Sequence, residues 1–459
     1  MTSTAFNSLP LPAAMLANLE SLGYHEMTPI QAQSLPVILQ GRDLIAQAKT
    51  GSGKTAAFGI GLLKGINPRY FGCQALVLCP TRELADQVAK EIRRLARGED
   101  NIKVLTLCGG VALGPQIASL EHGAHIIVGT PGRLQQHLDK QTLSLSGLNT
   151  LVLDEADRML DMGFFDAIAA VISHTPARRQ TLLFSATYPK GIEQLAGQFL
   201  RTPQQVKVEA LHTDSRIEQR FYEIDAEQRL PSVLKVLGHF RPVACVAFCF
   251  TRQQCQELVE LLTAKGISAA ALHGDLEQRD RDQVLAVFAN RSLSVLVATD
   301  VAARGLDIDG LDLVINVELA RDPEIHIHRI GRTGRAGESG QAVSLVAPAE
   351  AHRAQAIETL QKAPLTWCPL DALTHRGDGP LVPPMATLCI AAGRKDKLRP
   401  GDILGALTGD AGIPAAQVGK IALFDFQAFV AVERSLAKQA LARLNSGKIK
   451  GRALKVRLL

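Results

Sequence analysis

At 459 residues the chain is too long for a single hydrophobic core, so its length predicts two or three domains. Hydrophobic residues make up 46% and charged residues 21%, a balance that excludes a disordered protein. The net charge of +5 is uneven, because residues 385–459 carry 13 Lys and Arg against 5 Asp and Glu, a balance of +8 that leaves −3 for the rest. Such a basic block suggests a polyanionic partner, and the alternative is an ordinary solvated surface.

The cysteines and the hydropathy of the chain indicate its cellular compartment. The 8 cysteines are scattered without any Cys-x-x-Cys pair, which argues against a structural metal or a disulfide framework and favours a reducing compartment. The N-terminus lacks the basic start and apolar run of a signal peptide. No apolar stretch approaches the roughly 18 residues of a membrane-spanning helix. We therefore expect a cytoplasmic protein with no membrane partner. Separately, we expect a monomer.

Short, continuous apolar runs recur through the first 360 residues. Each run is followed by polar or glycine residues and then by a helical pattern. Runs of this kind are typical of parallel strands that are buried on both faces. They predict two α/β domains, over residues 1–207 and 216–362, with a seam in the polar stretch 204–220. The expected strands are 43–48, 75–80, 125–130, 150–155 and 181–186, and then 245–250, 268–273, 295–300, 313–318 and 342–347.

The last part of the chain has a different pattern. Residues 364–384 contain five prolines and no periodicity, so we expect a linker over residues 363–384. The order strand, helix, strand, strand, helix, strand over residues 385–459 is that of a small α+β ferredoxin-like domain. The expected strands are 385–392, 418–424, 427–433 and 453–458, and the expected helices are 401–409 and 435–445.

The segment "AKTGSGKT", residues 48–55, follows a buried strand and precedes a helix. Its glycines let backbone N–H groups turn towards phosphates, Lys54 supplies a positive charge, and Thr55 offers a hydroxyl to Mg²⁺. The strict pattern has Gly where this chain has Ala48. The segment predicts a phosphate-binding loop, whose candidate residues are Thr50, Gly51, Ser52, Gly53, Lys54 and Thr55.

The segment "VLDEAD", residues 152–157, lies at the carboxyl end of another expected buried strand, where open parallel sheets bind ligands. Asp154 is placed to hold Mg²⁺ through water, and Glu155 could orient and deprotonate a water molecule. The alternative is a helix start that favours acidic residues near its N-terminus. The phosphate loop favours the catalytic interpretation.

An ordered set of motifs over residues 6–355 resembles the DEAD-box RNA helicases. The resemblance implies two RecA-like domains, RNA as the substrate, and ATP and Mg²⁺ as cofactors. The motifs are "GYHEMTPIQ" (23–31), the phosphate loop, "PTRELA" (80–85), "GG" (109–110), "TPGR" (130–133), "VLDEAD", "SAT" (185–187), "QRDR" (278–281), "VATDVAARGLD" (297–307) and "HRIGRTGR" (328–335).

The resemblance also implies roles for single residues. Gln31 would hydrogen-bond adenine, with Phe6 stacking nearby, and Asp307 would contact the ribose or the γ-phosphate side. Arg332 and Arg335 would be arginine fingers, so that hydrolysis would require closure of the cleft between the domains. For Arg329 a structural and a catalytic role both stay open. Ser185 and Thr187 would couple the nucleotide state to RNA.

RNA would be held through phosphates and sugar hydroxyls, without base readout. The family implies local strand separation rather than processive translocation. The candidate RNA contacts are Thr81, Arg82, Gly110, Thr130 and Arg133 in the first domain, and Gln278, Arg281 and Thr299 in the second.

The last domain resembles an RNA-recognition motif, in which aromatic residues on two central strands stack on bases. Its stretch "DFQAFVAV", residues 425–432, keeps only the Ala-Phe-Val core of the usual pattern. Phe429 could stack on a base, or Phe424, Phe426 and Phe429 could belong partly to the core. The basic loops are the other candidates, and their residues are Arg394, Lys395, Lys397, Lys420, Lys448, Lys450 and Arg452.

A helicase core followed by this module resembles the DbpA type of bacterial DEAD-box proteins. That type implies recognition of a hairpin in the peptidyl-transferase region of 23S rRNA during assembly of the large ribosomal subunit. The competing hypothesis is an ATP-gated RNA clamp or chaperone with little unwinding.

Overall fold

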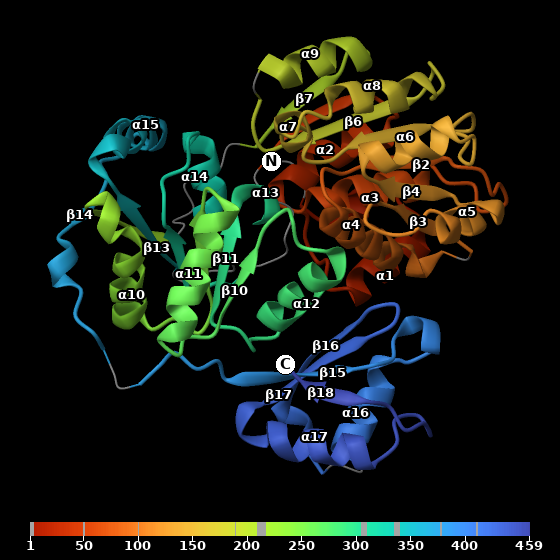
Figure 1. The fold of residues 1–459 in the computed structure, drawn as a ribbon. Helices are drawn as coiled ribbons and strands as arrows, with labels where there is room; N and C mark the ends of the chain where they lie inside the picture. The colour runs from red at the N-terminus through yellow and green to blue at the C-terminus, as the bar shows by residue number, and fades with distance from the viewer. Residues whose placement is uncertain are drawn as a thin grey trace. The chain divides into compact units, whose positions relative to one another are not determined.

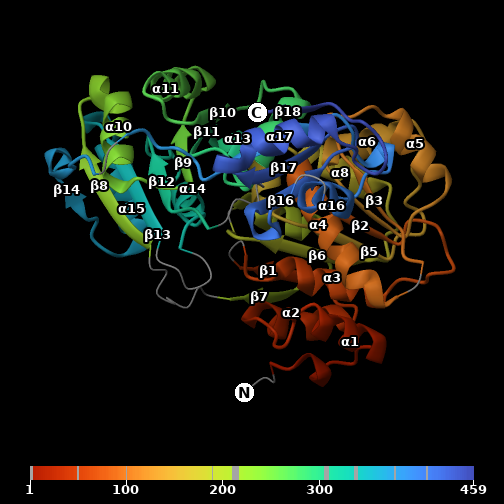
Figure 2. The same ribbon diagram turned by 90° about the horizontal axis from the view of Figure 1, so that it is seen from below.

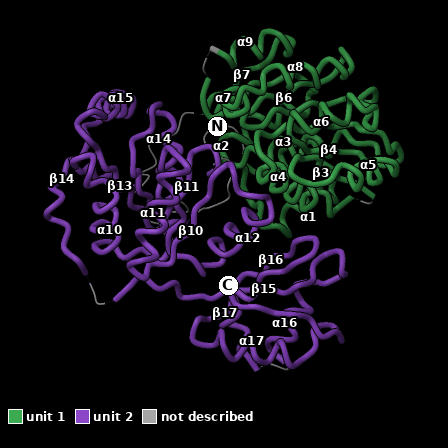
Figure 3. The backbone as a smooth tube through the Cα atoms, viewed as in Figure 1, with its two compact units in different colours: residues 1–213, 305–307 green, residues 214–304, 308–459 purple. Residues whose placement is uncertain are grey.

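The structure, a computed structural model, describes residues 4–48, 51–99, 101–188, 190–208, 217–303, 310–334, 340–376, 379–409 and 412–459. The chain divides into two compact units, residues 1–213 with 305–307 and residues 214–304 with 308–459 (Figure 3). The first unit contains one parallel sheet, and the second contains a parallel and an antiparallel sheet (Figure 1). The expected fold class is confirmed. None of the helices in the described ranges is long and apolar enough to cross a bilayer.

Helices cover both faces of the parallel sheet in the first unit (Figures 1 and 2). Ala75 and Val77 of one strand pack with the helices on one side, and the intervening Leu76 and Leu78 pack with those on the other. This double burial explains the unbroken apolar runs. In sheet order the strands are β3 (Val104–Leu107), β4 (Ile126–Gly129), β2 (Ala75–Leu78), β5 (Thr150–Leu153), β6 (Gln180–Ser185), β1 (Leu44–Gln47) and β7 (Gln204–Lys207). The helices are α1 (Ala13–Ser21), α2 (Pro29–Leu39), α3 (Lys54–Lys64), α4 (Arg82–Leu95), α5 (Gly114–Glu121), α6 (Pro131–Asp139), α7 (Ala156–Asp161), α8 (Phe165–Ser173) and α9 (Lys190–Phe199).

The parallel sheet of the second unit repeats this design. Its main core combines the central strands with apolar residues of two long helices, such as Val233 and Leu258. In sheet order the strands are β10 (Ala269–Leu272), β11 (Val295–Thr299), β9 (Cys245–Cys249), β12 (Leu313–Asn316), β13 (Gly340–Val346), β8 (Ile217–Glu223) and β14 (Trp367–Cys368). The helices are α10 (Arg229–Phe240), α11 (Arg252–Ala264), α12 (Gln278–Ala289), α13 (Asp300–Ala303), α14 (Pro323–Ile330) and α15 (Ala351–Gln361).

Four strands were not expected from the sequence: β3, β7, β8 and β14. Three of them lie at sheet edges, and β8 lies next to the edge strand β14. Strands β7 and β8 come from the polar stretch that was expected to be only a seam. A strand near an edge is less completely covered and tolerates polar side chains, so it lacks the apolar run of a central strand.

The proline-rich segment 363–384, expected as a linker, is packed along the second unit over its described residues. Trp367 of β14 pairs with Phe221 of β8. Leu373 and Leu381 pack with the core of the unit, and the ring of His375 lies against Gly238. The apolar residues between its prolines explain this attachment.

The antiparallel sheet has the expected ferredoxin-like order. Leu388 and Val430 face the core that the sheet shares with its two helices, while Cys389 and Phe429 face the opposite side. That opposite side packs against Ala286 of α12. The strands in sheet order are β16 (Val418–Leu423), β17 (Ala428–Glu433), β15 (Met385–Ile390) and β18 (Val456–Leu458), and the helices are α16 (Pro400–Thr408) and α17 (Ala437–Ser446).

Candidate functional site

The strand order of the first unit separates the predicted site residues into two groups. Apart from Phe6 and Gln31, which precede β1, they follow the carboxyl ends of parallel strands, where this type of sheet binds ligands. The phosphate loop, the segment at Asp154 and the segment at Ser185 follow the adjacent strands β1, β5 and β6. The candidate RNA contacts Thr81, Thr130 and Gly110 follow β2, β4 and β3, which form the other half of the sheet.

The phosphate loop depends on glycine at two described positions. Gly51 has φ 80° and Gly53 has φ 94°, a conformation that favours glycine. A Cβ atom on Gly53 would also lie 2.6 Å from Nε2 of Gln31. Gln31 accepts a hydrogen bond from the Thr28 backbone N–H (2.9 Å) and donates one to the Gly53 carbonyl (3.1 Å). The residue expected to read adenine therefore also supports the loop.

Lys54 and Ser52 of the loop, together with Ser185 at the end of β6, have the chemistry of an anion site. The Lys54 ammonium group is buried and donates to the carbonyl of Ala48 at 2.8 Å. The hydroxyls of Ser52 and Ser185 are buried without a hydrogen-bond partner among the described residues. A buried hydroxyl normally finds a partner. A positive charge, a turn of backbone N–H groups and unpaired hydroxyls fit a phosphate group with its cation.

Burial of the Asp154 carboxyl raises its pKa to about 7, although the nearby Lys54 ammonium lowers it. Its Oδ1 accepts a hydrogen bond from the Glu155 backbone N–H at 3.0 Å. A buried carboxylate close to a phosphate loop is a suitable outer ligand for Mg²⁺.

The raised pKa of Asp154 predicts a pH-dependent effect on the stability of the nucleotide-free protein. Below pH 4 the carboxyl is protonated in both the folded and the unfolded chain, and above pH 7 the folded state must hold an unfavourable charge. We expect Asp154→Asn to stabilise the first unit above pH 7 by up to about 4 kcal/mol, at 1.36 kcal/mol per pKa unit. The gain should vanish towards pH 4, as measured by thermal unfolding. The exposed Asp139→Asn is the matched control, and a gain independent of pH would contradict the assignment.

Glu155 occupies a strained junction between β5 and α7. Its backbone has φ 51° and ψ 50°, a conformation that is rare outside glycine. Its carboxylate forms a buried ion pair with the Arg158 guanidinium at 2.8 Å. Arg158 was not predicted as a site residue, and its position three residues after Glu155 on a helix was the available signal.

Asp157 joins α7 to the segment after β6. Its Oδ2 accepts hydrogen bonds from the backbone N–H groups of Ala186 (3.1 Å) and Thr187 (2.9 Å), and from the Thr187 hydroxyl (3.0 Å). A shift of α7 would therefore pull on this segment. The coupling role expected for Thr187 thus has a direct contact, whereas Asp157 itself was not predicted.

The candidate RNA contacts of the first unit lie at the carboxyl ends of β2, β3 and β4. Thr81 caps α4, and its Oγ1 accepts from the Leu84 N–H at 3.3 Å. Arg133 donates to Oε1 of Gln116 and to the carbonyl of Val111, both at 2.9 Å. One guanidinium nitrogen of Arg82 is buried without a partner among the described residues, and Gly110 has φ 76°. Gln116, which was not predicted, fixes the loop at Gly110 to α6.

In the second unit the predicted residues again follow carboxyl ends of strands. Gln278 donates to Asp282 at 2.8 Å along α12, and Arg281 donates to the carbonyl of Ala302 at 2.7 Å. Thr299 ends β11, and Arg332, which follows α14, is 8% exposed. Thr50, Asp307 and Arg335 lie outside the described residues.

Arg329 is held by its neighbours on several sides. It forms two hydrogen bonds with the Asp300 carboxylate, at 2.6 and 2.7 Å, and donates to Asn316 Oδ1 and the Glu318 carbonyl. A guanidinium engaged in this way positions the motifs around it. Of the two roles left open for Arg329, the geometry favours the structural one.

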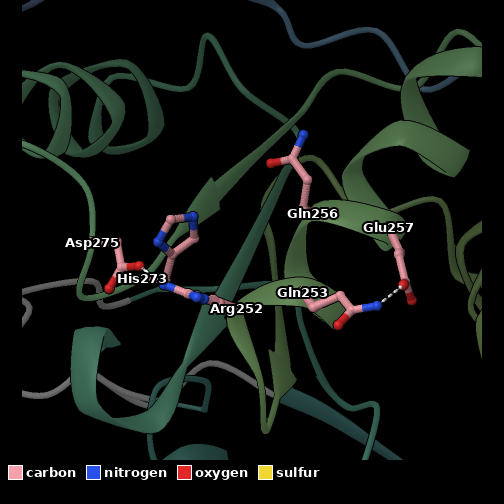
Figure 4. A pocket seen from close by; sticks show the side chains of 6 residues that line it. All are labelled: Arg252, Gln253, Gln256, Glu257, His273 and Asp275. Carbon is pink, nitrogen blue, oxygen red and sulfur yellow. Dashed lines mark hydrogen bonds and ion pairs between the residues drawn. The ribbon is translucent and has the colours of Figure 1, made fainter.

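A pocket of about 360 Å³ lies between the start of α11 and the segment after β10 (Figure 4). Arg252 forms an ion pair with Asp275 there, and Nδ1 of His273 is buried without a partner among the described residues. The pocket follows β9 and β10, at the same edge as Gln278 and Thr299. No residue of this pocket was predicted.

Family models match the chain in three successive segments. Residues 28–195 match the DEAD/DEAH box helicase model, residues 228–337 match the helicase conserved C-terminal domain, and residues 387–458 match the DbpA RNA binding domain.

Similar proteins agree with this division. The ATP-dependent RNA helicase DbpA of Escherichia coli (strain K12) is 56% identical over 457 residues, which cover 99% of this chain and 100% of that protein. The chain belongs to the DEAD-box ATP-dependent RNA helicases. The DEAD-box helicase CshA of Streptococcus pneumoniae serotype 4 is 46% identical over 358 residues, covering 78% of this chain and 68% of CshA. A solved structure of Dbp5 from S. cerevisiae, bound to RNA and ADP BeF3, covers 80% of this chain and 96% of that chain at 30% identity, with a TM-score of 0.73.

In the C-terminal domain of this helicase, two predicted RNA contacts also serve the fold. Lys450 donates to the Lys397 carbonyl at 2.6 Å and lies 3.4 Å from the Asp402 carboxylate. Arg452 donates to the Asp396 carbonyl at 3.3 Å. Both bonds attach the loop before β18 to the segment before α16. The predicted contacts Lys420 and Lys448 are exposed.

The aromatic residues of this domain differ sharply in exposure. Phe429 is fully buried, and Phe424 packs edge-on against it with ring centroids 5.4 Å apart. Phe426 is 72% exposed. The sequence left open whether these rings stack on bases or belong to the core. Phe429 belongs to a packed interface, whereas Phe426 lies in solvent.

Proposed function

We propose that this helicase couples RNA-stimulated ATP hydrolysis to local duplex unwinding in 23S rRNA, during assembly of the large ribosomal subunit in the cytoplasm. The single observation that carries the proposal is the near full-length similarity to DbpA, including the DbpA RNA binding domain over residues 387–458. The positive charge of that domain supports a tethering role. We expect the protein to act as a monomer.

In the proposed reaction the first unit supplies most of the nucleotide machinery. Lys54 would bind phosphate oxygens. Thr55 and Asp154 would hold Mg²⁺, which would neutralise part of the phosphate charge. Glu155, oriented by Arg158, would take the proton of the attacking water. Arg332 and Arg335 would stabilise charge on the transferring phosphoryl group.

The contacts of Asp157 provide a coupling that unwinding requires. Because Asp157 ties α7, which follows Glu155, to the segment at Thr187, a change at the nucleotide has a physical route to the neighbouring elements. An ATP-gated clamp would use the same route. It remains the alternative function.

The proposal predicts selective stimulation of ATP hydrolysis. A fragment of 23S rRNA containing the peptidyl-transferase hairpin should lower the RNA concentration for half-maximal ATPase activity by at least about tenfold relative to unrelated RNA of equal length, which corresponds to about 1.4 kcal/mol. Removal of residues 385–459 should abolish this preference and leave weak, unselective stimulation. Equal stimulation by both RNAs, or a preference that survives the truncation, would contradict the targeting role.

A further inference from the structure

The sheet face that carries Phe429 is covered inside the second unit. Phe429 and Cys389 pack against Ala286 of α12, and Phe429 is fully buried. Beside them Asn290, the residue that follows α12, and Thr387 of β15 exchange hydrogen bonds of 2.8 and 3.1 Å. The surface on which RNA-recognition motifs usually stack bases is therefore closed here, and stacking needs another aromatic residue.

Phe426 is that residue. At 72% exposure it is the most exposed large apolar side chain in the described ranges. It lies at the tip of the turn between β16 and β17, which is closed by the hydrogen bond from the Phe424 N–H to the Gln427 carbonyl at 2.9 Å.

The turn is fixed in place by the short helix η6 (Arg394–Asp396). The carbonyls of Phe424 and Asp425 accept hydrogen bonds from the backbone N–H groups of Arg394 (2.8 Å) and Lys395 (2.9 Å). A Cβ atom on Gly393 would lie 2.2 Å from the Phe424 carbonyl oxygen, so this close approach requires glycine. A ring on a fixed turn is ready to stack with a small loss of conformational entropy.

The surroundings of the turn are basic. Arg394 and Lys395 are exposed, and neither forms an ion pair within the described residues. Arg452 donates a hydrogen bond to the Asp396 carbonyl of the same short helix. Helix η6 therefore connects the turn to the basic loop before β18. The exposed Asp425 is the opposing charge on the turn. An exposed aromatic ring on a turn that is joined to a basic segment fits a nucleotide, which offers a base for stacking and phosphates for the charges.

We propose that Phe426 stacks on an unpaired base of the RNA held by the C-terminal domain, with Arg394 and Lys395 contacting the flanking phosphates. This inference rests on the proposed RNA-tethering function and adds a base contact to it. The ligand is a single-stranded nucleotide next to a duplex, and its sequence is not restricted, because every base has a face that can stack.

The test uses the full-length chain and two RNA probes with the same duplex, one blunt and one with a short single-stranded overhang. Phe426→Ala should weaken binding of the overhang probe about 5- to 150-fold, the range for loss of one base–aromatic stack, and leave the blunt probe unchanged. Phe426→Tyr should bind like wild type, and Phe426→Leu should bind like the Ala variant. Wild-type binding of the overhang probe by the Ala or the Leu variant would overturn the proposal and indicate a different partner for the ring.

A second readout reports stacking directly. With 2-aminopurine placed at successive overhang positions, wild type and Phe426→Tyr should quench one position that Phe426→Ala does not. The absence of any such position would overturn the proposal. The double variant Arg394→Gln/Lys395→Gln should lower the slope of log affinity against log salt by about 1.4, and the single Lys438→Gln on α17 is the control for charge loss. An unchanged slope would show that Arg394 and Lys395 do not contact RNA phosphates.

This test is independent of the rRNA target. If wild type shows no preference for the rRNA fragment, the targeting proposal fails. The comparison of overhang with blunt duplex still decides the role of Phe426, since both probes share one sequence in the stem.

Discussion

Glu155→Gln is expected to lower the rate of ATP hydrolysis by about 10²–10⁴-fold, the range for loss of a general base. The amide oxygen of Gln can still accept the hydrogen bond that Arg158 donates at 2.8 Å, so the junction between β5 and α7 should keep its geometry. The amide cannot take a proton from water. ATP and RNA binding should therefore stay close to wild type, as measured by nucleotide and RNA titrations beside steady-state turnover.

The matched control is Glu20→Gln, an exposed position on α1 of the same unit, which should turn over ATP normally. Arg158→Gln removes the orienting partner and should also reduce turnover, by less than the loss of the carboxylate itself. Normal turnover in Glu155→Gln would exclude Glu155 as the base.

Lys54→Met is expected to weaken ATP binding by about 10²–10⁴-fold. The side chain is 6% exposed, so Met fills nearly the same buried space without the charge. Hydrogen bonds to charged groups contribute about 1.5–3 kcal/mol each, and two phosphate contacts would be lost. Binding is best measured by displacement of a fluorescent nucleotide in the absence of RNA.

Helix α3 supplies its own control, because it begins at Lys54 and ends at the exposed Lys64. Lys64→Met removes the same charge from the same helix and should leave ATP affinity unchanged. Equal loss in both variants would point to the charge of the whole unit rather than to a phosphate contact, and would contradict the role of Lys54.

The candidate nucleotide site could be proposed from the sequence because its residues stand in contiguous segments. A phosphate loop needs its glycines, Lys54 and Thr55 next to one another, and Asp154 and Glu155 must follow a strand directly. The residues that contact them were harder to predict from the sequence. Gln31 supports Gly53 across 22 positions, and Asp157 reaches Thr187 across 30. Such pairs form only when the strand order of the sheet brings their segments together.

The sequence by itself determined the fold class, the helicase family and the residues expected to handle ATP, since apolar runs and local motifs are properties of short segments. The tertiary structure alone decided which surfaces are open. It covers the sheet face at Phe429 with α12 and leaves Phe426 in solvent. It also packs the proline-rich segment 363–384 against the second unit. Exposure depends on which distant surfaces pack together, and packing between distant elements leaves no pattern in the local order of residues.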